Sequence, residues 1–364
     1  MNICILSMQR VPNMGSVLQA YGLKKMLESQ GHRVEFIDIK AMDEDLNLHC
    51  EIEEKNDPTV VISNKYFINR VIHKFEYKKQ EKLFMDFMNA NLKLNHPSSI
   101  KKYDVCVIGS DEVFNCLNIR TIYGFTSQLF GNVDCADRVI TYAASCGSTD
   151  IAHVPQKMIE RIKTSFSNIK AFSVRDNNTF KFVNELTGIE PSINLDPVLV
   201  NDFSKEGENV KYNISKLPSH MCVIYAYGNR ISNPDEIKNI LNFCNEYSLE
   251  PVAVGSPQFW IRRFLPLHPF QISQVFSKAE FIITDTFHGT IFSYKYAPKF
   301  AIFVRPSNYN KLMDLAVRLK IVDHVVAPGN SLESISRLKK DRKAIDDYLL
   351  SERNKSMKYL RENI

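Results

Sequence analysis

His288 is the residue of this chain whose setting most favours chemistry. It lies in the run Thr284-Asp285-Thr286-Phe287-His288-Gly289-Thr290, which follows an apolar stretch over residues 280–284 and precedes a helical pattern. A histidine at such a strand-to-helix turn can exchange protons near neutral pH, and the small Gly289 leaves space for a ligand. A lone histidine is more often structural, but the strand-end position favours a catalytic or phosphate-binding role. Asp285 or Thr286 is the expected helix cap.

A second candidate is Arg175, in the run Ser173-Val174-Arg175-Asp176 at the end of another apolar stretch. Its planar guanidinium can grip a carboxylate or a phosphate through two parallel hydrogen bonds. The alternative is structural, because Asp176 can cap the following helix or hold Arg175 in an ion pair. Asp196, in Leu195-Asp196-Pro197, has two comparable interpretations: a turn acid before proline, or a carboxylate of the site.

Three further clusters of small and polar residues follow apolar runs. Asn13-Met14-Gly15-Ser16 precedes a helix, where backbone N–H groups suit an anion, although alone this motif is more typical of a plain turn and cap. Gly109-Ser110-Asp111 and Ala143-Ala144-Ser145-Cys146-Gly147 both combine small residues, which let a ligand approach the backbone, with a hydroxyl or carboxylate. One such cluster is typical of helix capping or packing, but two at one sheet edge favour a binding site.

The elements that must position these residues are short strands alternating with helices. This alternation is typical of βα units in a parallel sheet, whose ligands bind beyond the carboxyl ends of the strands. The pattern predicts an α/β protein with two Rossmann-like domains, residues 1–200 and 201–330, followed by a terminal helix over residues 331–364. Residues 41–102 lack glycine and predict a helical excursion of the first domain, a candidate lid. The expected strands are residues 2–6, 33–39, 104–108, 139–142, 170–174 and 193–195, then 221–227, 252–254, 280–284 and 300–304.

Length and composition exclude several classes of protein. A chain of 364 residues, 44% hydrophobic and 24% charged, is longer than one core usually serves and has the composition of a globular protein. No apolar run approaches the roughly 18 residues of a membrane span, and the first residues lack a signal-peptide pattern, so we expect a cytoplasmic protein. Eight cysteines without CxxC pairs or zinc spacing predict neither disulfides nor a metal site.

The formal net charge of +5 is unevenly placed. Residues 331–364 hold nine Lys/Arg against six Asp/Glu, a net +3. No nucleic-acid-binding signature accompanies this bias, so we expect no nucleic-acid partner. The basic face of the terminal helix would suit anionic lipid at the inner face of the membrane, but a solvated face on a helix that packs back across both domains is the favoured interpretation.

Taken in order, these motifs resemble the polysaccharide pyruvyl transferase family. The resemblance begins at residues 13–20, runs through the clusters at 108–111, 142–145 and 173–176, and continues to residues 195–197 and 287–289. Each piece is short, and their joint order and spacing carry the resemblance. It implies a GT-B-like pair of Rossmann-like domains facing across a cleft that holds the active site, with neither a metal nor a redox cofactor.

The resemblance also implies a reaction. Family members characterised as enzymes transfer the enolpyruvyl unit of phosphoenolpyruvate to a sugar of a surface-polysaccharide precursor, often lipid-linked, forming a ketal and releasing phosphate. On that basis we expect His288, Arg175 and Asp111 to be catalytic, with Arg175 holding the donor and His288 acting as acid or phosphate ligand. Asp196 is expected to bind the acceptor. The expected donor-binding residues are Gly15, Ser16, Ser110, Ser145, Thr286 and Gly289.

One departure from the family pattern concerns the donor. Many pyruvyl transferases have an arginine two residues before this histidine, where this chain has Thr286. The positive charge must then come from elsewhere, with Arg10, Arg263 and Arg305 as candidates. Two other functions stay open: a sugar-nucleotide glycosyltransferase of the same architecture, and a non-catalytic member of a polysaccharide-assembly complex.

Overall fold

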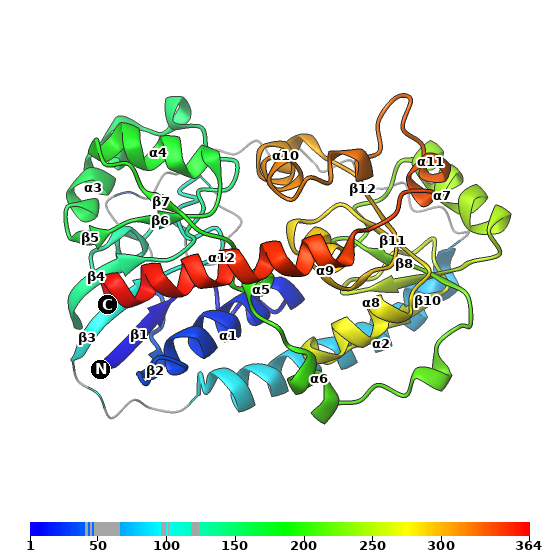
Figure 1. Cartoon of the computed structure of the whole chain (residues 1–364), viewed down its shortest axis with the longest axis horizontal. Coiled ribbons are helices and arrows are strands. Elements are labelled where there is room, and N and C mark those ends of the chain that lie inside the picture. Colours follow the sequence, from blue (N-terminus) through cyan, green and yellow to red (C-terminus); the bar gives the residue numbers. More distant parts are fainter. Residues whose placement is uncertain (41–42, 44–45, 47–65, 96–99, 101, 118–123) are drawn as a thin grey trace. The chain divides into compact units, whose positions relative to one another are not determined.

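The computed structural model describes residues 1–40, 43, 46, 66–95, 100, 102–117 and 124–364 (Figure 1). Part of the predicted excursion over residues 41–102 therefore lies outside the described residues. The chain divides into two compact units, neither of which is continuous in sequence. Unit 1 comprises Met1–Leu48, Phe87–Asn201 and Lys343–Ile364, and unit 2 comprises His49–Asp86 and Asp202–Arg342.

Unit 1 is built on a parallel sheet of five strands in the order β2-β1-β3-β4-β5. Its central strands β1 and β3 are buried over nearly their whole length, as expected where helices cover both faces of a parallel sheet. The strands are β1 (Asn2–Leu6), β2 (Arg33–Phe36), β3 (Tyr103–Ile108), β4 (Ala136–Thr141) and β5 (Ile169–Ala171).

A two-stranded parallel sheet, β6 (Ser173–Val174) with β7 (Ser192–Ile193), completes unit 1. The predicted strand over residues 170–174 is thus two strands with different partners, since β5 pairs with β4 and β6 pairs with β7. Isolated bridges join Asp111 to Ala144 and Ala144 to Val174, so the chain segments after β3 and β4 continue into this small sheet.

The helices of unit 1 cover these sheets. Helix α1 begins where the Asn13 side chain accepts a hydrogen bond from the Ser16 backbone N–H, which confirms the plain capping interpretation of that motif. Phe114, Phe130 and Phe166 form an aromatic centre of the core, with ring centroids 5.0–5.6 Å apart. The helices are α1 (Met14–Glu28), α3 (Gln156–Phe166), α4 (Asn177–Thr187) and α5 (Pro197–Val200), with a π-helical turn at Met88–Leu92 and 3-10 turns at Ser127–Phe130 and Ile151–His153.

Unit 2 contains a second parallel sheet in the order β10-β9-β8-β11-β12. The central strands β8 and β11 are fully buried. The strands are β8 (Met221–Tyr225), β9 (Glu250–Val254), β10 (Arg263–Leu265), β11 (Phe281–Thr284) and β12 (Phe300–Ile302). The prediction missed β10, whose sequence Arg-Phe-Leu is too short to show a strand pattern.

Helices flank this sheet too. They are α6 (Ser204–Asn209), α7 (Pro234–Glu246), α8 (Ile272–Lys278), α9 (Phe287–Tyr296), α10 (Tyr309–Arg318) and α11 (Leu332–Ser336), with 3-10 turns at Ile214–Lys216, Pro269–Gln271, Pro306–Asn308 and Val322–His324. Helix α2 (Phe67–Phe87) belongs to unit 2 up to Asp86, although it precedes most of unit 1 in sequence. The sequence pattern had placed this helix in the first domain.

The predicted terminal helix over residues 331–364 is two helices. Helix α11 ends at Ser336, and α12 (Arg342–Asn363) begins after a break in the helix. In the break, the Lys340 ammonium donates to the backbone carbonyls of Ser293, Tyr294 and Ala297 at the end of α9. Helix α12 then returns to unit 1, where the Tyr359 hydroxyl donates to the Thr141 carbonyl at 3.0 Å.

The architecture confirms the predicted α/β class with two Rossmann-like domains and a long C-terminal helix. The two sheets differ in strand order. Relabelled from their own first strand, unit 1 has the order 2-1-3-4-5 of flavodoxin-like folds, and unit 2 has the order 3-2-1-4-5 of dinucleotide-binding domains. In both, the direction of winding reverses beside the first strand, and that reversal marks where ligands bind.

Candidate functional site

The reversal in unit 1 lies between β1 and β3. The chain leaves these neighbouring strands in opposite directions, which opens a crevice beyond their carboxyl ends. The loop after β1 leads to Gly15 and Ser16 in the first turn of α1, and the loop after β3 carries Ser110 and Asp111. Four of the predicted site residues therefore lie at the position where this fold binds ligands.

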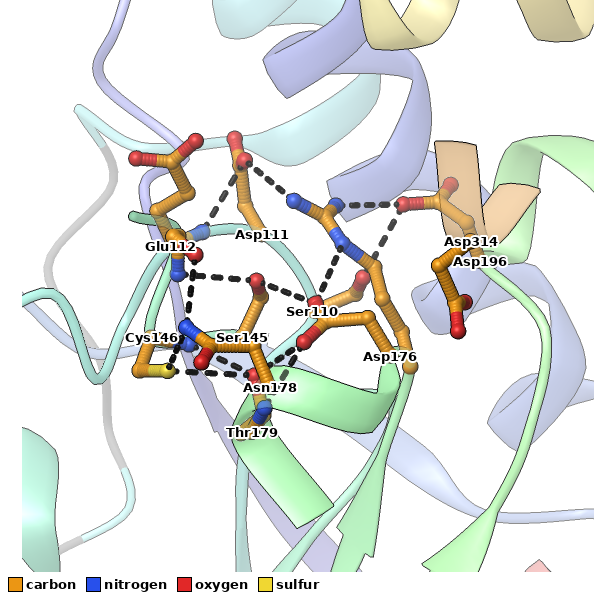
Figure 2. A network of polar contacts seen from close by, with 12 residues as sticks. Ser110, Asp111, Glu112, Ser145, Cys146, Asp176, Asn178, Thr179, Asp196 and Asp314 are labelled. Atoms are coloured by element: carbon orange, nitrogen blue, oxygen red, sulfur yellow. Dashed lines mark hydrogen bonds and ion pairs between the residues drawn. The ribbon is translucent and has the colours of Figure 1, made fainter. Parts of the chain in front are cut away.

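A ladder of backbone hydrogen bonds brings the other predicted residues of unit 1 to the same edge. The Ser145 N–H donates to the Asp111 carbonyl at 2.9 Å, and the Arg175 N–H donates to the Ala144 carbonyl at 3.0 Å. One step further, the Asn194 N–H donates to the Val174 carbonyl at 3.0 Å. Asp111, Ser145, Arg175 and Asp196 thus come from successive segments of one sheet edge, and their side chains converge in one polar network (Figure 2).

Arg175 is the centre of this network. Its side chain is 2% exposed, and one terminal nitrogen donates to Asp196 Oδ2 at 3.0 Å. Asp111 Oδ1 lies 3.8 Å from the other terminal nitrogen, and Asp176 Oδ2 lies 4.0 Å from Nε. Burial disfavours the charged guanidinium, but the carboxylates of Asp196, Asp111 and Asp176 outweigh it and raise the pKa of Arg175. One cation therefore faces three carboxylates.

Asp111 is the member of the network that reaches solvent, with 14% of its side chain exposed. Its Oδ2 accepts a hydrogen bond from the Ser16 hydroxyl at 2.7 Å, and its Oδ1 accepts from the Glu112 backbone N–H at 3.0 Å. Its backbone φ of +77° lies in the left-handed region, which is costly for a residue other than glycine and frequent at functional sites. The carboxylate is thereby held in place with one edge accessible.

The remaining polar residues of the edge hold the network together. The Ser110 hydroxyl donates to Asp196 Oδ2 at 3.1 Å, and the Ser145 hydroxyl donates to Asp176 Oδ2 at 2.7 Å. Asp176 also caps α4 by accepting from the Thr179 N–H, which is the structural alternative considered for it. Asp196 likewise caps α5, so it is both a turn acid and a member of the network.

In unit 2 the reversal lies between β8 and β11, and His288 follows β11. Thr286 is the cap of α9, since its hydroxyl accepts from the Gly289 N–H at 2.9 Å. His288 lies in the first turn of α9 and is 8% exposed. A Cβ on Gly289 would overlap the hydroxyl oxygens of Thr284 and Thr286, so glycine is required for this tight turn. Thr286, His288 and Gly289 thus group together, in a different unit from the Arg175 network.

Beside His288, Asp285 forms a second charged cluster. Its side chain is fully buried, and its Oδ2 lies 3.1 Å from Arg305 Nε and 3.4 Å from Arg230 Nε. The other two nitrogens of Arg305 donate to the carboxylate of Glu236 on α7. Burial raises the pKa of Asp285, although the two arginines oppose that shift. Two arginines balance two carboxylates here, in contrast to unit 1.

The arginines proposed to replace the missing family arginine are all paired. Arg10 donates two hydrogen bonds to the carboxylate of Asp38, and Arg263 donates to the carboxylate of Glu250. Arg305 donates to the carboxylates of Glu236 and Asp285. Sequence reasoning missed Arg230, whose guanidinium lies over the Tyr227 ring and donates to the Ser307 hydroxyl at 2.7 Å. The sequence feature that could have identified Arg230 is its position in the loop directly after β8, where the winding direction of the sheet reverses.

Hollows in the described surface lie both near and away from these clusters. One of about 500 Å³ adjoins the unit 2 cluster through Glu236, and amide and carboxylate side chains surround an apolar patch that includes Phe303. A larger one of about 880 Å³ follows β2 and the end of α1, where the ion pairs Lys24–Glu28 and Arg33–Glu35 line it.

Sequence comparison decides the family. The model of the polysaccharide pyruvyl transferase family matches residues 13–303, most of the chain, from the first turn of α1 to the end of β12. The chain belongs to this family. The match spans the Arg175 network, His288 and Asp285 with its partners Arg230 and Glu236, but it ends before Arg305. No curated protein matches the chain in sequence.

Solved structures with a similar arrangement of elements come from other families. The UDP-GlcNAc 2-epimerase of Methanocaldococcus jannaschii is 13% identical over all of this chain and 99% of its own, with a TM-score of 0.48. MnaA of S. aureus, solved with UDP, is 13% identical over 98% of this chain and 90% of its own, with a TM-score of 0.46. The glycosyltransferase SsfS6 of Streptomyces sp. SF2575 is 12% identical over 99% and 98%, with a TM-score of 0.42.

Two negative observations hold for the residues that the structure describes. Among them, no helix has the length and apolar character needed to cross a membrane. Within the same residues, no group of His, Cys, Asp and Glu side chains is arranged to hold a metal ion.

Proposed function

We propose that this protein transfers the enolpyruvyl unit of phosphoenolpyruvate to a saccharide precursor of a surface polysaccharide and forms a pyruvate ketal. The observation that carries the proposal is the family match over residues 13–303, which includes the polar residues at the reversal points of both sheets. Support also comes from the chemistry at those points, which hold a histidine, an accessible carboxylate, the buried Arg175 and the partly exposed Arg230 and Arg305.

The reaction sets clear demands on the protein. One acceptor hydroxyl adds to the central carbon of phosphoenolpyruvate while the methylene carbon gains a proton and becomes a methyl group. The C–O bond to phosphate then breaks, and a second hydroxyl attacks the same carbon and closes the ketal. Two hydroxyl protons are lost, one proton is gained by carbon, and hydrogen phosphate leaves with the other. The protein must therefore supply an acid, a base and sites for an anionic donor and a polyol.

We assign the acid to His288 and the base to Asp111. Asp111 is the accessible carboxylate of the unit 1 network, and hydrogen bonds from Ser16 and the Glu112 N–H fix its orientation. Arg175, expected to hold the donor, already binds Asp196 and lies near Asp111, so we assign it a positioning role. Ser110 and Ser145 support Asp196 and Asp176 in the same way.

The donor is assigned to unit 2. A trianionic phosphoenolpyruvate is repelled by a site with three carboxylates around one arginine, whereas neutral sugar hydroxyls bind well to carboxylates. The Asp285 cluster is neutral overall, and Arg230 lies at its edge with 23% of its side chain exposed. Arg230 therefore takes the part of the missing family arginine. Asp111 serves the acceptor directly, and Asp196, which the sequence suggested for that role, supports it through Arg175.

Thermal stability with single ligands tests the donor. A ligand that binds only the native state raises the melting temperature, by about 2.7 kcal/mol of stability at one hundred times its Kd. We expect phosphoenolpyruvate to raise the melting temperature and UDP-GlcNAc to leave it unchanged. The opposite pattern contradicts the proposal and favours a sugar-nucleotide enzyme, while a shift with neither favours a non-catalytic protein.

Replacing His288 tests the catalytic assignment. His288→Ala is expected to lower ketal formation, followed as phosphate release, by about 10²–10⁴-fold, because a general acid contributes that much. The matched control is His153→Ala, since His153 is exposed on unit 1 and pairs with Asp150. Both variants should melt close to the wild type. Wild-type turnover in His288→Ala would remove the residue from the mechanism.

A further inference from the structure

Helix α2 packs on unit 2 through polar side chains as well as through Tyr77. Asn69 Nδ2 donates to the Phe259 carbonyl at 2.9 Å, and Gln80 Nε2 donates to the Leu267 carbonyl at 2.8 Å. His73 Nε2 lies 3.3 Å from the Arg262 carbonyl, and His73 and Gln80 are fully buried. Polar groups therefore fasten α2 to unit 2, on the side where a soluble helix usually presents apolar residues.

The opposite side of α2 is apolar and exposed. Phe67, Ile68, Val71, Ile72 and Phe75 recur at the spacing that places residues on one helix face, and between 41% and 73% of each is exposed. Single exposed apolar residues are common on proteins, but five adjacent ones on one face mark a surface that another molecule covers. We call these five residues the outer face of α2.

Basic residues flank the outer face. Helix α2 carries five Lys or Arg against three Asp or Glu. Lys78, Lys79 and Lys82 are exposed on the next two turns of the same side, and Arg70 and Lys74 lie along its edge. Lysines beside an apolar helix face are the pattern of helices that lie in a bilayer surface, where the apolar side chains enter the lipid and the ammonium groups meet anionic headgroups.

We propose that the outer face of α2 docks onto a bilayer that contains anionic phospholipid, with the helix in the plane of the membrane surface. This inference is independent of the proposed reaction. A parallel pair of copies fits less well, because it would bring Lys78 and Lys82 of the two chains together. An antiparallel pair is the alternative that the experiment below separates from lipid binding.

Helix α12, for which the sequence favoured a packed helix with a solvated basic face over a lipid contact, is not needed for this role. Its apolar residues Ile345 and Leu360 are buried, and Tyr359 bonds to the backbone of unit 1. Its apolar side is thus used within the protein. Leu350, which is 59% exposed on α12, offers a control position for the experiment.

Vesicle flotation tests the proposal with the full chain. We expect the protein to float with vesicles of phosphatidylcholine and phosphatidylglycerol and to bind pure phosphatidylcholine vesicles much more weakly. The double variant Ile68→Ser/Phe75→Ser should lower binding about tenfold or more, because two large side chains no longer enter the lipid. Lys78→Gln/Lys82→Gln should lower it about fivefold per lysine, which corresponds to about 1 kcal/mol each. Leu350→Ser should bind like the wild type.

The same variants separate the alternatives. All changed side chains are exposed, so the melting temperatures should stay near that of the wild type and show that the variants fold. Failure of the wild type to float, or unchanged flotation of both double variants, overturns the proposal. Sedimentation equilibrium in the absence of lipid adds a further outcome: a dimer that Ile68→Ser/Phe75→Ser dissociates, together with no flotation, would assign the outer face to a second copy instead.

Discussion

Removing the charge of Arg175 should destabilise unit 1 far more than breaking an ordinary ion pair. In Arg175→Met the methionine fills much of the space, but Asp196, 1% exposed, loses its cation while Asp111 and Asp176 remain nearby. Breaking a buried ion pair from one side costs about 3–5 kcal/mol, because a buried charge is left without compensation. We expect a loss of that size in the free energy of unfolding.

Urea denaturation followed by far-UV circular dichroism measures this loss. The matched control is Arg263→Met, because Arg263 also pairs with a carboxylate, that of Glu250, but both side chains are more than 40% exposed. A pair that exposed contributes less than about 1 kcal/mol. The double variant Arg175→Met/Asp196→Asn removes both charges and keeps an oxygen to cap α5, so it should be more stable than Arg175→Met alone.

Two results would refute this reasoning. If Arg175→Met costs no more than Arg263→Met, the buried guanidinium does not hold the network together. If Asp196→Asn destabilises the Arg175→Met protein further, the uncompensated carboxylate of Asp196 is not the source of the loss. The second result would direct attention to Asp111 and Asp176.

Two further predictions concern unit 2. Gly289→Ala should lower the free energy of unfolding by about 1–3 kcal/mol in urea titration, because the new Cβ overlaps the Thr284 hydroxyl. The control is Gly228→Ala, whose Cβ meets no atom closer than 4.0 Å and which should cost under half of that. Equal costs of the two substitutions would contradict this explanation. Burial raises the pKa of Asp285 above its usual 3.8, so ionisation of Asp285 costs the folded state free energy as the pH rises. The melting temperature of the wild type relative to Asp285→Asn should therefore fall as the pH rises above about 4, and a constant difference would show that Arg305 cancels the cost of burial.

The positions of the candidate residues could be predicted because strand ends are visible in the sequence. Apolar runs of a few residues followed by small and polar ones locate the carboxyl ends of parallel strands, and those ends meet at one sheet edge. The clusters at 109–111 and 143–147 are expected at one edge on this basis, and the backbone hydrogen bonds bring them together there. The same ladder of bonds adds Arg175 and, through β7, Asp196 to that edge. The α/β class followed from the same alternation.

The partners of these residues could not be predicted. From the sequence, Arg175 could pair with a ligand, with Asp176 or with Asp196. Its actual partner depends on how β6 and β7 lie beside each other, and no local sequence pattern contains that information. The pairing of Arg305 with Glu236 joins residues 69 positions apart. Helix α2 shows the same limit, because the spacing of Phe67 to Phe75 indicates a face but not whether it turns toward the protein.

The charge of each reversal point constrains which substrate it can take. In unit 1 the buried arginine is outnumbered by carboxylates, and the hydroxyls of Ser16, Ser110 and Ser145 donate to those carboxylates. Such an edge has spare acceptors, which suits the donor protons of sugar hydroxyls. In unit 2 the arginines and carboxylates balance, so an anion entering there meets no excess of negative charge. A transferase that brings a trianion to a polyol needs both kinds of surface, and neither unit alone provides them.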